Sequence, residues 1–236
     1  MAENKDFCQE ILQVILNNKE LVVLSTNSQF STKNLQGRSC MLDAKCQLED
    51  GRIVNIEVQR ADDDDHQRRV RYNGALLTTN LTNPSTKFAE IPDVIVVFIS
   101  KFDVFKSSKT LYHIDRVIRE TGKAVDNGFE EIYVNAEIDD DSDVARLMNV
   151  FNTDTAYDDD KFPVTSAYKR RYKTTEEGVR EMCEVIERNR AEGRAEGRAE
   201  LIINMLKNHM KPEHIAKIAN MTVEQIISIG KKAAVL

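Results

Sequence analysis

The stretch "SCMLDAKCQLEDGRIVNIEVQ", residues 39–59, contains two runs in which apolar and polar residues alternate, separated by Glu-Asp-Gly. Such alternation is typical of a β-strand with one buried face. An Asp-Gly pair is typical of the tight turn that joins two antiparallel strands. The stretch therefore predicts a β-hairpin with strands over residues 39–48 and 52–59.

The length of the turn decides which side chains meet across this hairpin. A two-residue turn at Asp50-Gly51 would place Asp43 on the apolar face of the second strand, away from Glu57. A three-residue loop, with Gly51 in the left-handed conformation, places Asp43 directly across from Glu57. We expect the three-residue loop, because a slip by one residue would move the apolar residues off their common face. On the first strand that face would consist of Cys40, Leu42, Ala44, Cys46 and Leu48.

The opposed pair Asp43 and Glu57 predicts a site for a cation. Directly opposed residues have Cβ atoms about 5 Å apart, and like charges at that distance are destabilising. Lys45 lies on the same face and could supply part of the positive charge. A divalent ion is the stronger explanation, because Mg²⁺ is typically held by one or two carboxylates together with water and phosphate oxygens. The structural alternative is an exposed hairpin face whose acids point into water.

A helix is expected directly after the hairpin. Asp65 is a plausible N-cap for a helix that runs to about Leu81. Its first two turns carry Arg68, Arg69 and Tyr72, which are placed as phosphate-positioning groups would be.

The run of four aspartates, residues 62–65, is conspicuous but is interpreted as a loop and a helix cap. We exclude Asp62, Asp63 and Asp64 from the metal site, because four consecutive acids in a loop rarely all bind one ion. His66 and His113 have no partner at ligand spacing and are interpreted as ordinary polar residues.

The segment "LDAKCQLEDGRIVNIEVQ", followed by the Arg/Tyr helix, resembles the PD-(D/E)XK nuclease superfamily. More closely, it is similar to the bacterial recombination-promoting nuclease and putative transposase family, firmly over residues 39–100 and loosely over 180–230. The resemblance implies an α/β, restriction-endonuclease-like mixed sheet flanked by helices, with a helical C-terminal extension. It implies Asp43 and Glu57 as ligands of Mg²⁺ or another divalent cation such as Mn²⁺ or Ca²⁺. Gln59 would stand in the place of the superfamily's catalytic lysine.

The chain departs from the pattern of the superfamily at several positions. Leu42 stands where the superfamily has proline before the aspartate, and the N-terminal segment is short compared with many members. The amide of Gln59 can orient water but supplies no charge, so Lys45 is our candidate for the missing cation. An acid of the first helical region, Glu10 or Glu20, is a candidate for a further metal ligand.

The remaining elements of the core follow from hydrophobic periodicity. Residues 6–17 predict a helix, and the polar stretch 25–37 is interpreted as a loop. The apolar run 93–100 predicts a central strand buried on both faces. Residues 111–118 and 130–138 predict further strands, and the pattern becomes helical from residue 142 onward.

The C-terminal part is predicted to be helical and separate from the core. We expect a nuclease-like core over residues 1–175, a helical connector over 176–200 and a small helical tail over 201–236. The connector contains the repeat "EGRAEGRAE", and the region 176–208 could form one long helix with Gly193 stacked over Gly197. The alternative is a flexible connector, because each glycine weakens a helix by roughly 1 kcal/mol. In the tail, residues 211–232 predict two short helices with helix-turn-helix-like spacing. Thr222 and Gln225 would form a capping box at the start of the second helix.

Composition restricts the class of protein. The formal net charge is −6, which argues against a protein that simply coats polyanions, although basic residues cluster locally at 168–173. The four cysteines form no CxxC pair, the N-terminus lacks a signal peptide, and no apolar run has membrane-spanning length. We therefore expect a reduced, cytoplasmic protein without a membrane partner.

Together these features predict a metal-dependent DNA endonuclease, linked by the resemblance to recombination or transposition. DNA is the expected partner, and a homodimer would supply the two sites that cutting both strands requires. The alternative function is that of a non-catalytic DNA-binding or assembly protein that keeps the nuclease scaffold and acts through residues 211–232. A further alternative is a degenerate copy without activity.

Overall fold

The computed structural model describes residues 4–32, 40–62, 65–175, 195 and 197–233. The chain divides into two compact units, residues 1–169 and 170–236, and each is described by itself. Most of the expected connector lies outside the described residues, as do Gly193, Asp63 and Asp64. The predicted division at residues 175 and 200 therefore stays a prediction.

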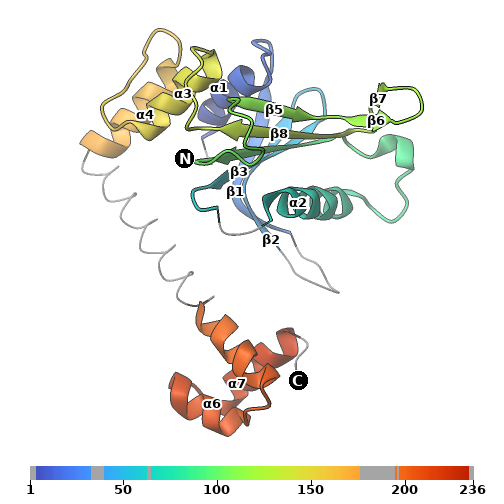
Figure 1. Cartoon of the computed structure of the whole chain (residues 1–236), viewed down its shortest axis with the longest axis vertical. Helices are drawn as coiled ribbons and strands as arrows, with labels where there is room; N and C mark the ends of the chain where they lie inside the picture. Colours follow the sequence, from blue (N-terminus) through green and yellow to red (C-terminus); the bar gives the residue numbers. More distant parts are fainter. Residues whose placement is uncertain (1–3, 33–39, 63–64, 176–194, 196, 234–236) are drawn as a thin grey trace. The chain divides into compact units, whose positions relative to one another are not determined.

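A six-stranded mixed sheet forms the centre of the first unit, as predicted (Figure 1). Strands β3, β4 and β8 run parallel, and the other neighbouring pairs are antiparallel. A separate two-stranded hairpin consists of β6 (Arg116–Ile118) and β7 (Lys123–Val125). In their order across the sheet, the six strands are β1 (Val23–Thr32), β2 (Cys40–Leu48), β3 (Ile53–Gln59), β4 (Val94–Ser100), β8 (Phe129–Asn135) and β5 (Leu111–Ile114).

Helices cover both faces of this sheet. The helices α1 (Lys5–Ile15) and α3 (Asp143–Asn152) lie on one face, and α2 (His66–Leu81) lies on the other (Figure 1). The alternate residues of β4 accordingly belong to two different cores: Ile95, Val97 and Ile99 pack with α1 and α3, and Val94, Val96 and Phe98 pack with α2. The prediction of a central strand buried on both faces is thus confirmed. The unit also contains the 3₁₀ turn η1 (Phe88–Glu90) and the helix α4 (Pro163–Thr174), which continues into the second unit.

The hairpin between β2 and β3 has the predicted register. Ala44 pairs with Ile56, and Gln47 pairs with Ile53. The amide of Leu48 donates to the carbonyl of Arg52 over 2.9 Å, which closes the three-residue loop. Gly51 in this loop has a φ of 92°, in the left-handed region that favours glycine. The paired residues end at Ala44 and Ile56, one position before Asp43 and Glu57, and beyond them the amide of Val58 donates to the side chain of Asp43.

The alternation of β2 breaks at its N-terminal end, which the sequence did not indicate. Ala44 and Cys46 belong to the core under α1, as predicted, but Leu42 packs with Val70 and Leu77 of α2. The break coincides with Gln29 of the neighbouring strand, whose φ of 49° interrupts the regular pleat. The prediction of one common face for all the apolar residues of β2 is therefore wrong at Leu42.

Two other predictions about strands need correction. The polar stretch 25–37 was predicted to be a loop, but its residues through Thr32 belong to strand β1. This strand is at the edge of the sheet, where a strand can form its ladder without apolar side chains on both faces. The strand predicted over 111–118 ends at Ile114, and the chain then enters the separate hairpin β6–β7. The strand predicted over 130–138 is confirmed as β8.

The second unit contains a small helical cluster. The described helical residues 197–207 pack with α6 (Pro212–Ala219) and α7 (Val223–Lys232), as predicted for two short helices over 211–232. The capping box of Thr222 and Gln225 is present. The core consists of Ile202, Leu206, Ile215, Ala216 and Ile226. Nowhere in the described ranges is a helix both long and apolar enough to cross a membrane.

The loop at Gly51 provides a test of the register. We expect Gly51→Ala to lower the free energy of unfolding by about 1–2 kcal/mol, because an alanine at this positive φ places its Cβ too close to the backbone. Gly51→Asn is the matched control and should cost less, since asparagine tolerates left-handed conformations. Urea denaturation measures both. Equal stability of wild type and Gly51→Ala would contradict the left-handed loop.

Candidate functional site

Glu57 is buried near the end of β3, with only 1% of its surface exposed. Its Oε1 atom accepts a hydrogen bond from Asn55 Nδ2 over 2.9 Å. Its Oε2 atom has no hydrogen-bond partner among the described residues, and Arg69 Nη2 lies 3.6 Å away. Burying a carboxylate oxygen without a partner is costly, so this position favours a nearby cation.

The carboxyl group of Asp43 is hydrogen-bonded to the backbone of β3, the strand that carries Glu57. Its Oδ2 atom accepts a hydrogen bond from the amide of Val58 over 2.8 Å. The surrounding protein displaces part of the hydration of this group and raises the pKa of Asp43, while the Val58 amide and the charge of Arg69 act in the opposite direction. The charge of Asp43 in turn acts on Glu57, so these two carboxyl groups, which β2 and β3 supply separately, lie close enough to influence each other.

The electrostatics of the pair favour an additional positive charge. Burial, and after it the negative charge of Asp43, raise the pKa of Glu57 from its ordinary value to about 7. Asn55, Arg69 and Asn73 lower it without cancelling the rise. A divalent cation at this position would favour the ionised form of both carboxyl groups.

Arg69 connects Glu57 to Gln59. The Arg69 Nη1 atom donates to Gln59 Oε1 over 3.1 Å, while Nη2 faces Glu57 Oε2 at 3.6 Å. At its other end, the Gln59 amide donates from Nε2 to the carbonyl of Ala61 over 3.0 Å. The side chain of Gln59 is therefore held in one orientation beside the two carboxylates.

The other predicted site residues, Arg68, Tyr72 and Lys45, have different surroundings. Arg68 is on the solvent side of α2, with 77% of its side chain exposed, and pairs with Asp65 over 3.2 Å. Tyr72 is half-buried on the same helix, three residues after Arg69. The ammonium group of Lys45 lies 4.4 Å from the centroid of the Phe30 ring, and desolvation lowers its pKa.

The two candidate acids of the N-terminal region have other surroundings. Both carboxylate oxygens of Glu10 accept hydrogen bonds from the first amides of α4, those of Val164 over 3.0 Å and Thr165 over 2.7 Å. Glu10 thus caps a helix. Glu20 is exposed in the turn before β1.

In the aspartate-rich run, the predicted helix cap at Asp65 is confirmed. The Asp65 side chain accepts from the Arg68 amide over 3.0 Å and caps α2. Asp62 Oδ1 lies 3.1 Å from Nε2 of His66, whose buried ring packs 4.7 Å from that of Phe102. Within the described ranges, no group of three or more His, Cys, Asp or Glu side chains could hold a metal ion.

The sequence did not indicate that Asn55 and Asn73 contribute to the site. Asn55 precedes Glu57 by two residues on one face of β3, and Asn73 follows Arg69 by four residues on one face of α2. Both are buried and both lower the pKa of Glu57. Strand and helix periodicity could have identified them, but only once Glu57 and Arg69 were known to face one another.

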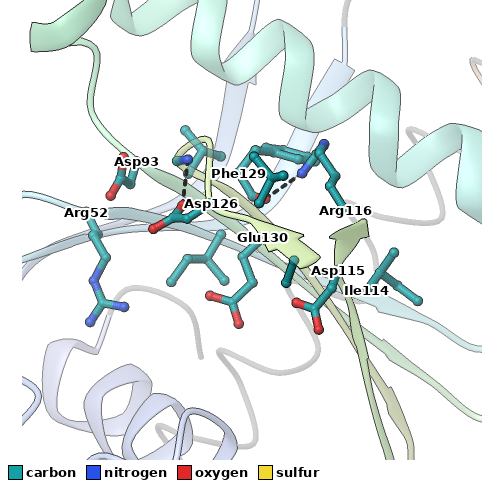
Figure 2. Close-up of a pocket in the computed structure, with 13 residues that line it drawn as sticks. Arg52, Asp93, Ile114, Asp115, Arg116, Asp126, Phe129 and Glu130 are labelled. Atoms are coloured by element: carbon teal, nitrogen blue, oxygen red, sulfur yellow. Dashed lines mark hydrogen bonds between the residues drawn. The ribbon is translucent and has the colours of Figure 1, made fainter. Parts of the chain in front are cut away.

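The amino ends of the parallel strands have a different character (Figure 2). A cavity of about 390 Å³ there is lined by side chains of both signs, including Arg52, Asp93 and Glu130. Arg116 Nη1 donates to the carbonyl of Phe129 over 2.7 Å, as the dashed line in Figure 2 shows. None of the predicted site residues lines this cavity. The candidate site therefore lies toward the carboxyl ends of the parallel strands, where ligands bind in many α/β sheets.

The raised pKa of Glu57 predicts how stability depends on pH. The folded value of about 7 exceeds the ordinary value of 4.5, so the metal-free fold loses stability as the pH rises through about 7. Glu57→Gln imitates the neutral acid. We expect it to stabilise the metal-free chain at a pH above the folded value, by about 3 kcal/mol at most, and the gain to shrink in acid.

Urea denaturation in a metal chelator across this pH range measures the effect. Glu49→Gln, in the exposed hairpin loop, is the matched control and should show no such dependence. If Glu57→Gln were destabilising at every pH, the ionised carboxylate would be the favoured form and the prediction would be wrong.

Comparison with known proteins agrees with this geometry. A family described as PD-(D/E)XK nuclease family transposase matches residues 1–145. No curated protein and no solved structure gives a significant match to the chain. The superfamily typically uses divalent metals, and the family is one of DNA-directed nucleases. Because the match spans more than half of the chain and includes the hairpin with Asp43 and Glu57, the chain belongs to the PD-(D/E)XK nuclease family transposases.

Proposed function

We propose that the protein is a metal-dependent endonuclease that hydrolyses phosphodiester bonds in DNA. The observation that carries the proposal is the buried Oε2 atom of Glu57, which has no hydrogen-bond partner in the described residues, forms only a 3.6 Å ion pair with Arg69, and lies within the electrostatic influence of Asp43. The two carboxylates face one guanidinium group, that of Arg69. An oxygen-only donor set with excess negative charge fits Mg²⁺, Mn²⁺ or Ca²⁺.

The residues around this pair have separable roles in the proposed reaction. A bound divalent ion would supply an activated water and stabilise negative charge on the phosphate. The amide of Val58 holds one oxygen of Asp43, which leaves the other oxygen to serve as a ligand. Gln59 would position the attacking water, because Arg69 and the Ala61 carbonyl fix its amide group.

We further propose that Arg69 supplies the positive charge that the superfamily's lysine would supply at position 59. Its distances of 3.1 Å to Gln59 and 3.6 Å to Glu57 support this role. Lys45, the other candidate, has its ammonium group over Phe30. Arg68 and Tyr72, which flank Arg69 on α2, would contact neighbouring phosphates, and a homodimer would provide two sites for two strand cuts.

The competing function is that of a non-catalytic DNA-binding or assembly protein acting through α6 and α7. Asn220, with a φ of 50°, ends α6, and Thr222 begins α7, which is a turn of helix-turn-helix-like length. The capping box, however, already uses the side chains of Thr222 and Gln225. Glu224 also places negative charge at the end of α7 that would enter DNA. We therefore rank this function second.

Nicking of supercoiled plasmid tests the enzymatic proposal. With Mg²⁺ or Mn²⁺, Asp43→Asn and Glu57→Gln should each lower the cleavage rate by about 100-fold or more, because each removes a carboxylate that would hold the ion, and the ion stabilises the negative charge of the transition state. Glu49→Gln in the same hairpin should cleave like wild type. The ion should raise the melting temperature of wild type and Glu49→Gln but not of the two site variants.

The same plasmid assay separates the enzyme from its rivals. Cleavage that persists in both site variants, or that never occurs in the wild type, would overturn the proposal. DNA binding without cleavage in the wild type would favour the non-catalytic function.

A second set of variants tests which side chain supplies the positive charge for cleavage. Arg69→Ala should lower kcat by about 100-fold, Arg69→Lys should recover part of the loss, and Lys45→Ala should have little effect. Arg68→Ala is the matched control on the same helix and should weaken DNA binding more than it lowers kcat. If Lys45→Ala abolished cleavage and Arg69→Ala did not, Lys45 would be the acting cation.

A further inference from the structure

A second feature of the molecule adjoins the proposed site. A cavity of about 470 Å³ lies at the carboxyl ends of β3, β4 and β8, on the face covered by α1 and α3. Asp43 and Gln59 belong to its wall as well as to the proposed site. A molecule in this cavity would therefore lie beside the phosphate that the proposed site attacks.

The interior of the cavity has the chemistry of a pocket for a flat, largely apolar group. Its floor contains Ile56, Ile99 and Met148, and its size is that of pockets for small organic molecules. Phe151 of α3 contributes an aromatic ring that is 37% exposed and packs edge-on against Phe7 at 5.8 Å between centroids. An accessible, anchored aromatic ring is what proteins use to stack a nucleobase.

The polar residues that line the cavity are also compatible with a nucleobase. Asn152 lines the cavity, and its Nδ2 atom donates to the carbonyl of Ala136, so its side-chain oxygen is the atom that could accept a hydrogen bond from the edge of a base. Arg60 and Lys101 also line it, and both are exposed. Arg60 directly follows β3, and Lys101 directly follows β4. The amide of Lys101 donates to the carbonyl of Gln59 over 3.1 Å, so the ends of the two strands are hydrogen-bonded to each other. Asp43 and Asp154 also line the cavity, so its wall carries charges of both signs, and Arg60 and Lys101 would contact the phosphates of a base that stay outside.

A base can enter such a pocket only when it is not stacked in a duplex. Enzymes that bind a single base accept single strands or rotate the nucleotide out of the helix, which costs least at mismatches and unpaired positions. On this basis, and resting on the proposed nuclease function, we propose that the cavity between β3, β4 and α3 binds an unpaired nucleobase next to the scissile phosphate. The substrate class is accordingly DNA with an unpaired or easily unpaired nucleotide at the cleavage site.

Binding by the full-length protein in a metal chelator tests the pocket independently of cleavage. The probes are short duplexes that contain one 2-aminopurine, either paired or unpaired. Wild type should bind the unpaired probe about tenfold more tightly, and the fluorescence of its 2-aminopurine should be quenched by stacking. Phe151→Ala should remove both the preference and the quenching, and Phe151→Tyr should retain them.

Two controls separate the base from the phosphates. Phe88→Ala replaces a phenylalanine that is 92% exposed and lies outside the cavity, so it should leave the preference unchanged. Arg60→Gln with Lys101→Gln should weaken binding of both probes alike. Equal affinity of wild type for the two probes, or a preference that survives in Phe151→Ala, would overturn the inference. Because these measurements need no metal, a failure of the nuclease proposal would appear separately, as absent plasmid nicking.

Discussion

The register of one hairpin determines whether Asp43 and Glu57 lie close enough to form the proposed cation site. The three-residue loop that ends at Gly51 sets the pairing of β2 with β3, and that pairing brings Asp43 near enough to act on the charge of Glu57. A change of one residue would turn every side chain of one strand to the other face. Glu57 would then leave its place under α2, and the two carboxylates would no longer influence each other.

The sheet gives this pair two different environments. Glu57 is enclosed on the face covered by α2, where Asn55, Asn73 and Arg69 are its polar neighbours. Asp43 lies where the alternation of β2 breaks, and it lines the cavity on the face of α1 and α3. One carboxylate is therefore fixed in the interior, and the other is accessible from the cavity. This asymmetry suits a site in which one ligand is held rigidly and the substrate enters from one side.

Much of this arrangement could be predicted because the hairpin is locally determined. Only one turn length reconciles the two alternating runs, so Asp43 and Glu57 could be paired from sequence alone. The break at Leu42 could not be predicted, since it accompanies the conformation of Gln29 on a neighbouring strand. Strand β1 was missed for a related reason: its ladder depends on β2, and its polar residues carry no hydrophobic pattern.

The choice among the arginines of α2 depends on tertiary contacts. Arg68 and Arg69 are neighbours in sequence, but successive residues point about 100° apart around a helix. Burial of Val70, Asn73 and Leu77 turns the side of α2 that carries Arg69 toward the sheet and leaves Arg68 in solvent. The position of positive charge in the site therefore follows from which residues of α2 pack against β4. In this chain, the packing of one helix against the sheet brings the guanidinium group of Arg69 to Gln59, the residue that we propose stands in the place of the superfamily's lysine.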